Sequence, residues 1–124
     1  MTAPNLISLT TITGKTTGTN VTTTGTTTLL SNASGSGHLY KINTLNVANI
    51  SNTSTVSVTI NWYTAANSGG TAFAIAGAIS IPSNTTLNII DKSSQYYLEE
   101  NTSLGVVTST ANALIVTTSY EDLS

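Results

Sequence analysis

The chain has 124 residues, of which only 6% are charged, against about 25% in an ordinary globular protein. Its net charge is −2, with three lysines and no arginine, so it lacks the basic stripe of a nucleic-acid-binding surface. The absence of cysteine excludes disulfides and thiol nucleophiles, and no segment is typical of a signal peptide or a membrane helix. We therefore expect one domain whose partners are neither nucleic acid nor membrane.

The first elements are expected in a region rich in threonine. LISLTTIT predicts a strand, and residues 19–31 predict an edge strand or an arm extended onto a neighbour. Between them, ITGKTTGT spells part of a phosphate-binding loop. A Walker A loop needs a glycine where this chain has Leu9, and a helix where it has TNVTTTGTTTLL, so we expect no nucleotide site.

Alternating hydrophobicity predicts two strands in the middle of the chain. TVSVTINWYT places one set of apolar residues on a single face, which we expect to be buried: Val56, Val58, Ile60 and Trp62. In LYKINTLNVANI the alternation changes phase at Asn43, which indicates a bulge. The segment ISNTST is expected to be the hairpin turn between these two strands.

The rest of the chain predicts four more strands, separated by turns of Asn, Ser and Gly. They are TAFAIAGAISI, TLNIIDK, YYLEENTSLGVVTS and ALIVTTSYEDL. Pro82 ends the first of them, in which Gly77 marks a bend or a close contact. About eight strands at regular spacing predict an all-β, single-domain antiparallel β-sandwich, with a jelly-roll or an Ig-like Greek-key topology. We expect residues 1–31 to form an N-terminal strand and a Thr-rich arm, and residues 32–124 to form the body.

Candidate catalytic and metal-binding residues are few. His38 is the sole histidine, and no G-x-S-x-G elbow supplies a serine nucleophile, so we expect a solvated or capping role for it. The acidic residues lie in the last third of the chain: Asp91, Glu99, Glu100, Glu121 and Asp122. They lack EF-hand spacing, which leaves calcium binding by these loops open. No catalytic, cofactor-binding or metal-binding residue is predicted, no cofactor is expected, and an enzyme is the weakest hypothesis.

Six Asn-x-Ser/Thr sequons occur, and they begin at Asn20, Asn32, Asn49, Asn52, Asn84 and Asn101. Serine and threonine make up roughly a third of the chain, which produces almost this many sequons by chance. They therefore do not predict glycosylation.

Four runs resemble small structural proteins of tailed bacteriophages: ITGKTTGT, HLYKINTLNVANISNTSTVSVTINWY, ISIPSNTTLNIIDKSSQYYLEENTSLGV and LIVTTSYEDL. The matching positions are Pro82, Asp91, Lys92, Tyr97, Leu98, Glu99, Glu100, Ser119, Tyr120 and Glu121. The resemblance covers nearly the whole chain and implies a virion component. That component is a capsid decoration or cement protein bound to the major capsid protein, or alternatively a neck or tail subunit. The resemblance also implies that Gly14-Lys15 is the turn leaving the first strand, with Lys15 as a surface or interface charge.

An uncharged, hydroxyl-rich exterior suits close packing against copies of the chain or against a large neutral partner. We therefore expect a non-enzymatic homo-oligomer, such as a trimer, in the virion. A hypothesis from another class is a carbohydrate-binding or adhesin module that uses residues 67–70 and one of Tyr96 and Tyr97. Adjacent residues of a strand point to opposite faces, so one of these tyrosines would stack on a sugar while the other packs inward.

Overall fold

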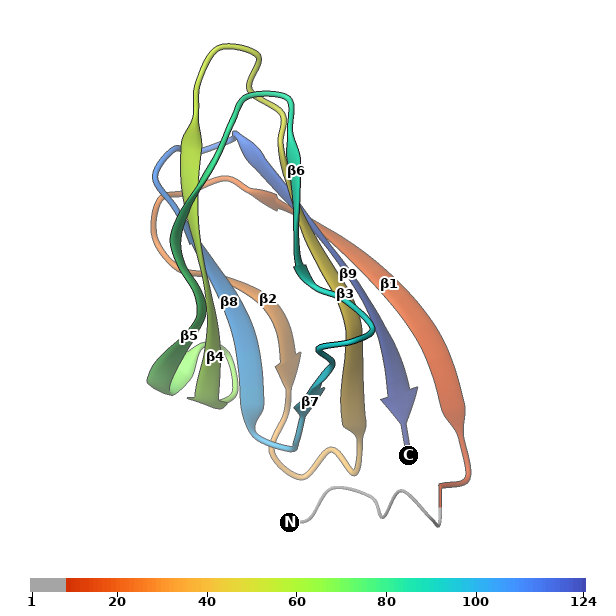
Figure 1. Ribbon diagram of the computed structural model, residues 1–124. Coiled ribbons are helices and arrows are strands. Elements are labelled where there is room, and N and C mark those ends of the chain that lie inside the picture. Colours follow the sequence, from red (N-terminus) through yellow and green to blue (C-terminus); the bar gives the residue numbers. More distant parts are fainter. Residues whose placement is uncertain (1–8) are drawn as a thin grey trace.

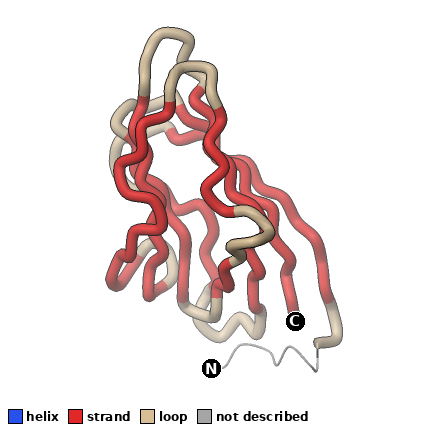
Figure 2. Tube along the Cα trace, viewed as in Figure 1, coloured by secondary structure: helices blue, strands red, loops and turns tan. Residues whose placement is uncertain are grey.

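Nine antiparallel strands form two packed sheets in the computed structural model, which describes residues 9–124 (Figure 1). The strands are β1 (Ile12–Val21), β2 (Thr27–Asn32), β3 (Leu39–Asn49), β4 (Val56–Ala65), β5 (Gly69–Ile81), β6 (Thr86–Ile90), β7 (Tyr96–Leu98), β8 (Thr102–Thr108) and β9 (Leu114–Leu123). Loops and turns join them, and no helix forms among the described residues (Figure 2). The predicted all-β antiparallel sandwich is therefore confirmed.

The strand order is that of a jelly roll. The first sheet has the order β1-β9-β3-β6, with β7 also paired to β3, and the second sheet has the order β2-β8-β4-β5. The pairs are nested along the chain: β4 pairs with β5, then β3 with β6 and β7, then β2 with β8, and finally β1 with β9. Every connection except β4–β5 and β6–β7 crosses between the sheets. Of the two predicted topologies, the jelly roll is the one found.

Two details of the predicted connections are wrong. ISNTST is not a hairpin turn, because β3 belongs to the first sheet and β4 to the second, so this segment crosses between the layers. YYLEENTSLGVVTS is not one strand but two, β7 and β8, which lie in different sheets. The chain turns between them at Asn101, whose φ is +60°. Asparagine tolerates this left-handed conformation better than most residues, and the break accounts for the ninth strand.

The core lies between the sheets and follows the predicted alternation. Val56, Val58 and Ile60 on β4 are fully buried, whereas Trp62 is only half-buried. The facing side chains of β3, including Ile42 and Leu45, are fully buried as well. The expected bulge in β3 is confirmed, because its register with β9 shifts between Ile42 and Thr44. Each such buried aliphatic side chain contributes about 1.5–3 kcal/mol to stability.

The Thr-rich segment belongs to the sandwich itself. Within residues 9–31 it forms β1 at one edge of the first sheet and most of β2 at one edge of the second, so the edge-strand alternative holds there. β2 spans the boundary expected between residues 31 and 32. Gly14 and Lys15 are not in a turn but in the middle of β1. Residues 1–8, which include part of the expected LISLTTIT strand, lie outside the described residues.

Two buried asparagines hold crossing connections in place. The Asn32 amide nitrogen donates to the carbonyls of His38 and Leu98, at 2.8 and 2.9 Å. The Asn49 amide nitrogen donates to the carbonyls of Ser54 and Ile81, each at 2.9 Å. In both cases one side chain joins the connection that follows its own strand to the end of a strand that is distant in sequence. Asn32 joins the β2–β3 connection to β7, and Asn49 joins the β3–β4 connection to β5. Both asparagines begin sequons, and the fold buries them, so neither is accessible for glycosylation in the folded chain.

Candidate functional site

An aromatic cavity opens at one side of the sandwich, where β5 of the second sheet faces β7 of the first. Its volume is about 370 Å³. The residues that line it are Trp62, Phe73, Ala74, Ile75, Tyr96 and Tyr97. Four of these are aromatic in a chain that has seven aromatic residues, and none of the six is charged. The fold therefore gathers more than half of its aromatic residues at one place.

The cavity follows from two interruptions of regular pairing. Trp62 on β4 is the register partner of Phe73 on β5, and their ring centroids lie 5.9 Å apart. The register of this pair of strands shifts between Ile60 and Asn61, where β4 and β5 are bulged against each other. On the other sheet, the strand that pairs with β3 is broken into β6 and β7 by residues 91–95. The two tyrosines of β7, which follow this break, line the cavity together with Phe73, Ala74 and Ile75 from the bulged middle of β5.

The lining side chains are unusually exposed for their type. Phe73 is 54% exposed, Tyr96 38% and Tyr97 44%. They make up half of the large hydrophobic side chains that are exposed among residues 9–124. A concave site with aromatic walls and a few hydroxyl groups is typical of small-ligand binding, and an uncharged lining favours a neutral ligand. The apolar faces of sugar rings can stack on such aromatic rings while tyrosine hydroxyls bind the sugar hydroxyls.

The residues predicted for a carbohydrate site are only partly brought together. Tyr96 and Tyr97 both border the cavity, and their register partners on β3, Ile42 and Lys41, place them on opposite faces as expected. Neither packs fully inward, since both remain partly exposed. Sequence reasoning missed Phe73 and assigned Trp62 wholly to the core. One signal in the sequence could have found this site. Trp62 and Phe73 lie on consecutive predicted strands, on either side of the turn that joins them.

The loop at residues 67–70 does not line the cavity. It folds over the outer face of the second sheet, where the backbone N–H of Ser68 donates to Ser103 Oγ at 2.9 Å. The N–H of Asn67 donates to Ser31 Oγ, also at 2.9 Å. These two hydrogen bonds hold the loop against strands β2 and β8. Because the two N–H groups are used within the chain, the role of the loop is structural. The prediction that residues 67–70 belong to a sugar site is not supported by this geometry.

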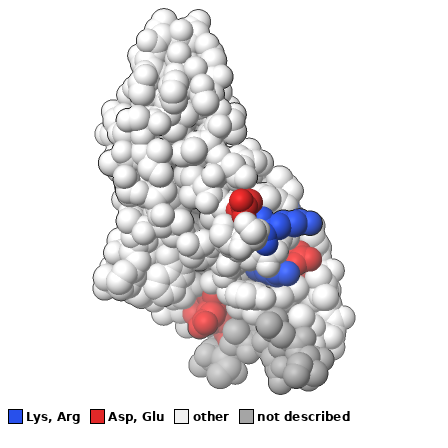
Figure 3. All heavy atoms as spheres, viewed as in Figure 1, with Lys and Arg blue, Asp and Glu red and all other residues white. Residues whose placement is uncertain are grey.

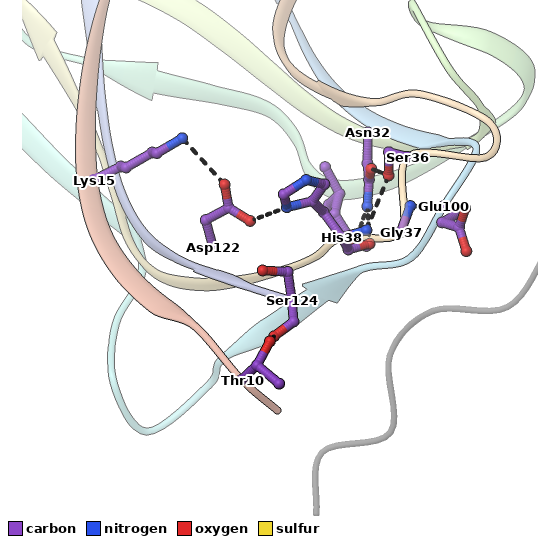
Figure 4. Close-up of polar contacts among 10 residues, drawn as sticks. Thr10, Lys15, Asn32, Ser36, Gly37, His38, Glu100, Asp122 and Ser124 are labelled. Atoms are coloured by element: carbon purple, nitrogen blue, oxygen red, sulfur yellow. Dashed lines mark hydrogen bonds and ion pairs between the residues drawn. The ribbon is translucent and has the colours of Figure 1, made fainter. Parts of the chain in front are cut away.

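A second cluster joins His38, Asp122 and Lys15 at the end of the first sheet where the C-terminus lies (Figure 4). His38 Nδ1 lies 2.6 Å from Asp122 Oδ1, and Lys15 Nζ donates to Asp122 Oδ2 at 3.1 Å. The expected solvated or capping role of His38 is therefore wrong, because Asp122 orients its ring. The partner is 84 residues away in the chain, so no local motif signals it. Lys15 is the surface charge that the resemblance implied, although it is paired.

The electrostatics of this cluster centre on the largely buried Asp122 carboxylate. Burial tends to raise the pKa of Asp122, but its hydrogen bonds to His38 and Lys15 outweigh burial, so the pKa lies below its usual value. The hydrogen bond to Asp122 raises the pKa of Lys15. Within residues 9–124 no serine or threonine hydroxyl bonds the His38 ring, so the cluster lacks a catalytic triad's third member there. Its evident effect is to tie β1 and the start of β3 to β9.

The other acidic side chains are dispersed. Asp91 accepts hydrogen bonds from the side chain and N–H of Ser93, which lower its pKa. Glu121 pairs with Lys41 at 3.6 Å, and Glu100 accepts from the N–H of Gly37 at 3.2 Å. Among residues 9–124 no three His, Asp or Glu side chains converge as metal ligands would. On the face drawn in Figure 3 the charged side chains gather towards one end and the rest of the surface has none.

Comparisons with protein-family models, with curated proteins and with solved structures find no match to this chain. In the part of the chain that the structure describes, no helix is long and apolar enough to cross a membrane.

Proposed function

We propose that this protein is a non-enzymatic structural protein of a tailed-bacteriophage virion, which decorates the head by binding the major capsid protein. The observation that carries the proposal is the distribution of charge between the two sheets. None of the strands of the second sheet, β2, β8, β4 and β5, contains a charged residue. The charged residues lie instead on β1, β3, β9 and residues 91–100.

An uncharged sheet face can be buried against a partner at low cost. Its outward side chains are mainly small hydroxyl and methyl groups, such as those of the register partners Ser57 and Ser80. Burying a hydroxyl that finds a hydrogen-bond partner is much less costly than burying an unpaired charge. Two of the three lysines are already paired within the chain, with Asp122 and Glu121, so few charges are left to steer or repel a partner. The sequence resemblance to phage structural proteins supports a capsid as that partner.

The test is binding of the purified chain to capsids assembled from the major capsid protein of the same genome. We expect co-sedimentation in a fixed ratio and a higher temperature of capsid disruption. Ser80→Lys puts a charge on the outer face of the second sheet and should weaken binding at least tenfold. Thr117→Lys, on an exposed position of β9 in the first sheet, is the matched control and should bind like the parent. Failure to bind, or equal binding by both variants, would contradict the proposal.

A neck or tail position remains the alternative within the same class. Electron microscopy of complete particles separates the two, since a decoration protein lies over the head lattice in many copies. Labelling confined to the neck or the tail would replace the head assignment.

A second candidate function, binding of a neutral carbohydrate, is favoured by the aromatic cavity. Phe73→Ala and Tyr97→Ala should each reduce affinity for a glycan identified on an array by at least about tenfold, because each removes a stacking surface. Ile79→Ala is the control, since Ile79 is an exposed apolar residue of β5 that does not line the cavity. If no glycan binds, or if Ile79→Ala has the same effect, the cavity is not a sugar site.

A further inference from the structure

The outer edge of β1 differs from the other edges of the two sheets. β2 has six residues with a register shift between Thr28 and Leu30, β5 has three shifts against β4, and the β6–β7 edge is interrupted. Short strands and bulges are devices that prevent edge strands from pairing with other chains. β1 pairs with β9 over ten residues with no shift, and it contains no proline. Its lysine, Lys15, is turned towards Asp122 and is not projected from the edge.

No second strand among residues 9–124 pairs with the outer edge of β1, and the backbone groups at this edge can be identified from the ladder. Thr11 N donates to Ser124 O at 2.9 Å, and Ser124 N donates to Thr11 O at 3.0 Å. Hydrogen-bonded and non-hydrogen-bonded pairs alternate along an antiparallel ladder, so the odd-numbered residues of β1 point their N–H and C=O groups at β9. The even-numbered residues then point theirs outward. These are Ile12, Gly14, Thr16, Gly18 and Asn20, all of them exposed.

The sequence of β1 is nearly symmetric about Thr16. TGKTTGT, residues 13–19, reads the same in both directions except for Lys15 and Thr17. When a second β1 is laid antiparallel with Thr16 opposite Thr16, Gly14 faces Gly18 and Ile12 faces Asn20. All five outward-pointing residues then form hydrogen-bonded pairs with two bonds each, about ten in total. A shift by one pair leaves one residue in each strand without a partner.

The side chains are compatible with this register. Lys15 stands opposite Thr17 of the second copy, so the two lysines, which would repel each other, are not directly paired. Neither Gly14 nor Gly18 is required by the chain's own fold, because a Cβ at either position would have nothing within 4 Å and neither φ is positive. Glycine weakens a strand unless another backbone or ligand approaches it closely. Their symmetric placement about Thr16 is what a two-fold pair of strands predicts.

We propose that two copies of this protein pair through β1 about a two-fold axis at Thr16, which joins their first sheets into one continuous antiparallel sheet. A two-fold pair closes with two copies, so the oligomer is a dimer and not the trimer expected from the sequence. The outer face of the second sheet stays free in the dimer. The pairing does not depend on the virion role, because it is a property of the isolated chain.

Sedimentation of the full chain tests the proposal. Thr16→Pro removes an outward N–H that β9 does not use, so it should preserve the strand signal in circular dichroism and raise the dimer dissociation constant at least about tenfold. Thr16→Val keeps the N–H and should remain dimeric. A monomeric or trimeric parent chain at high micromolar concentration, or a folded Thr16→Pro chain that still dimerises, would overturn the proposal.

A cross-link keeps the proposal testable if Thr16→Pro fails to fold. The chain has no cysteine, so Thr16→Cys introduces a single thiol. Hydrogen-bonded partners in an antiparallel pair have Cα atoms about 5.5 Å apart, which suits a disulfide. Oxidation should therefore give a covalent dimer. Thr53→Cys, at an exposed position of the β3–β4 connection, is the control, and equal cross-linking of both variants would contradict the proposed axis.

Discussion

Replacement of Asn49 tests whether buried amides hold the crossing connections of this jelly roll. Asn49 is 2% exposed and lies at the end of β3, where the chain leaves the first sheet for the second. Its amide nitrogen donates to the carbonyls of Ser54 and Ile81, each at 2.9 Å. Its carbonyl oxygen accepts from the N–H of Ser51 at 3.0 Å. All three hydrogen bonds are lost in Asn49→Ala.

The expected cost is a large part of the stability of a domain this size. Each lost hydrogen bond costs about 1 kcal/mol net, so three give about 3 kcal/mol, against a total of about 5–15 kcal/mol for a native protein. Asn49→Asp keeps the shape but places a carboxylate against two carbonyls. At pH 7 it should cost at least as much as Asn49→Ala, and protonation at low pH should restore part of the loss, because a neutral carboxyl can donate one hydrogen bond.

Urea unfolding followed by the fluorescence of Trp62 measures these differences. Asn46→Ala is the control, because Asn46 lies on the same strand but is only partly buried, and its loss should be within about 0.5 kcal/mol. A loss below about 1 kcal/mol for Asn49→Ala, or one equal to that of the control, would refute the structural role of the amide.

Two further predictions concern the packing at Gly105 and the ion pairs of Asp122. A Cβ at Gly105 would lie 2.8 Å from Tyr63 Cε2, so Gly105→Ala should cost about 1–3 kcal/mol in thermal or urea unfolding. A Cβ at Gly77 would have nothing within 4 Å, so Gly77→Ala should be nearly neutral, and similar losses for both would contradict the packing argument. The pKa of Asp122 is lowered on folding, so its ionised form stabilises the protein above about pH 4, and this contribution is lost as the pH falls through the folded pKa. Asp122→Asn should therefore cost about 1–3 kcal/mol at pH 7 and much less at pH 2 to 3, and an equal loss at both pH values would argue against it.

The strands could be predicted from the sequence, but their sheet assignment could not. Alternation in β4 and the phase change at Asn43 in β3 are local patterns, and both were confirmed. Whether ISNTST folds back within one sheet or crosses to the other depends on which partners β3 and β4 find. Turn residues such as Ser and Asn serve equally well in hairpins and in crossings. The break between β7 and β8 was similarly hidden, because the left-handed turn at Asn101 has the same composition as any other Asn-containing segment.

The candidate sites were predictable only where one residue type stands out. The adjacent aromatic residues Tyr96 and Tyr97 were predicted as candidate ligand-binding residues, and both border the cavity. Trp62 was assigned to the core because alternation shows which face of a strand is apolar but not where the opposing sheet ends. Gly77 was expected to mark a bend or a close contact. A Cβ at this position would have nothing within 4 Å, so no close contact requires the glycine, and the left-handed residue is its neighbour Ala78, whose φ is +49°.

The position of β1 in the nested fold leads to a prediction about amide exchange. Val21 is the sole buried residue of β1, so the strand is held mainly by its ladder to β9 and by the pairing of Lys15 with Asp122. In a monomer the amides that point at β9, such as those of Lys15 and Thr17, should exchange slowly, while that of Thr16 exchanges freely. Dimerisation should protect Thr16 as well and should make its protection rise with protein concentration. Nuclear magnetic resonance at two concentrations measures this directly. Protection of Thr16 that does not change with concentration, or odd-numbered amides that respond as strongly, would show that the outer edge of β1 is not where two copies meet.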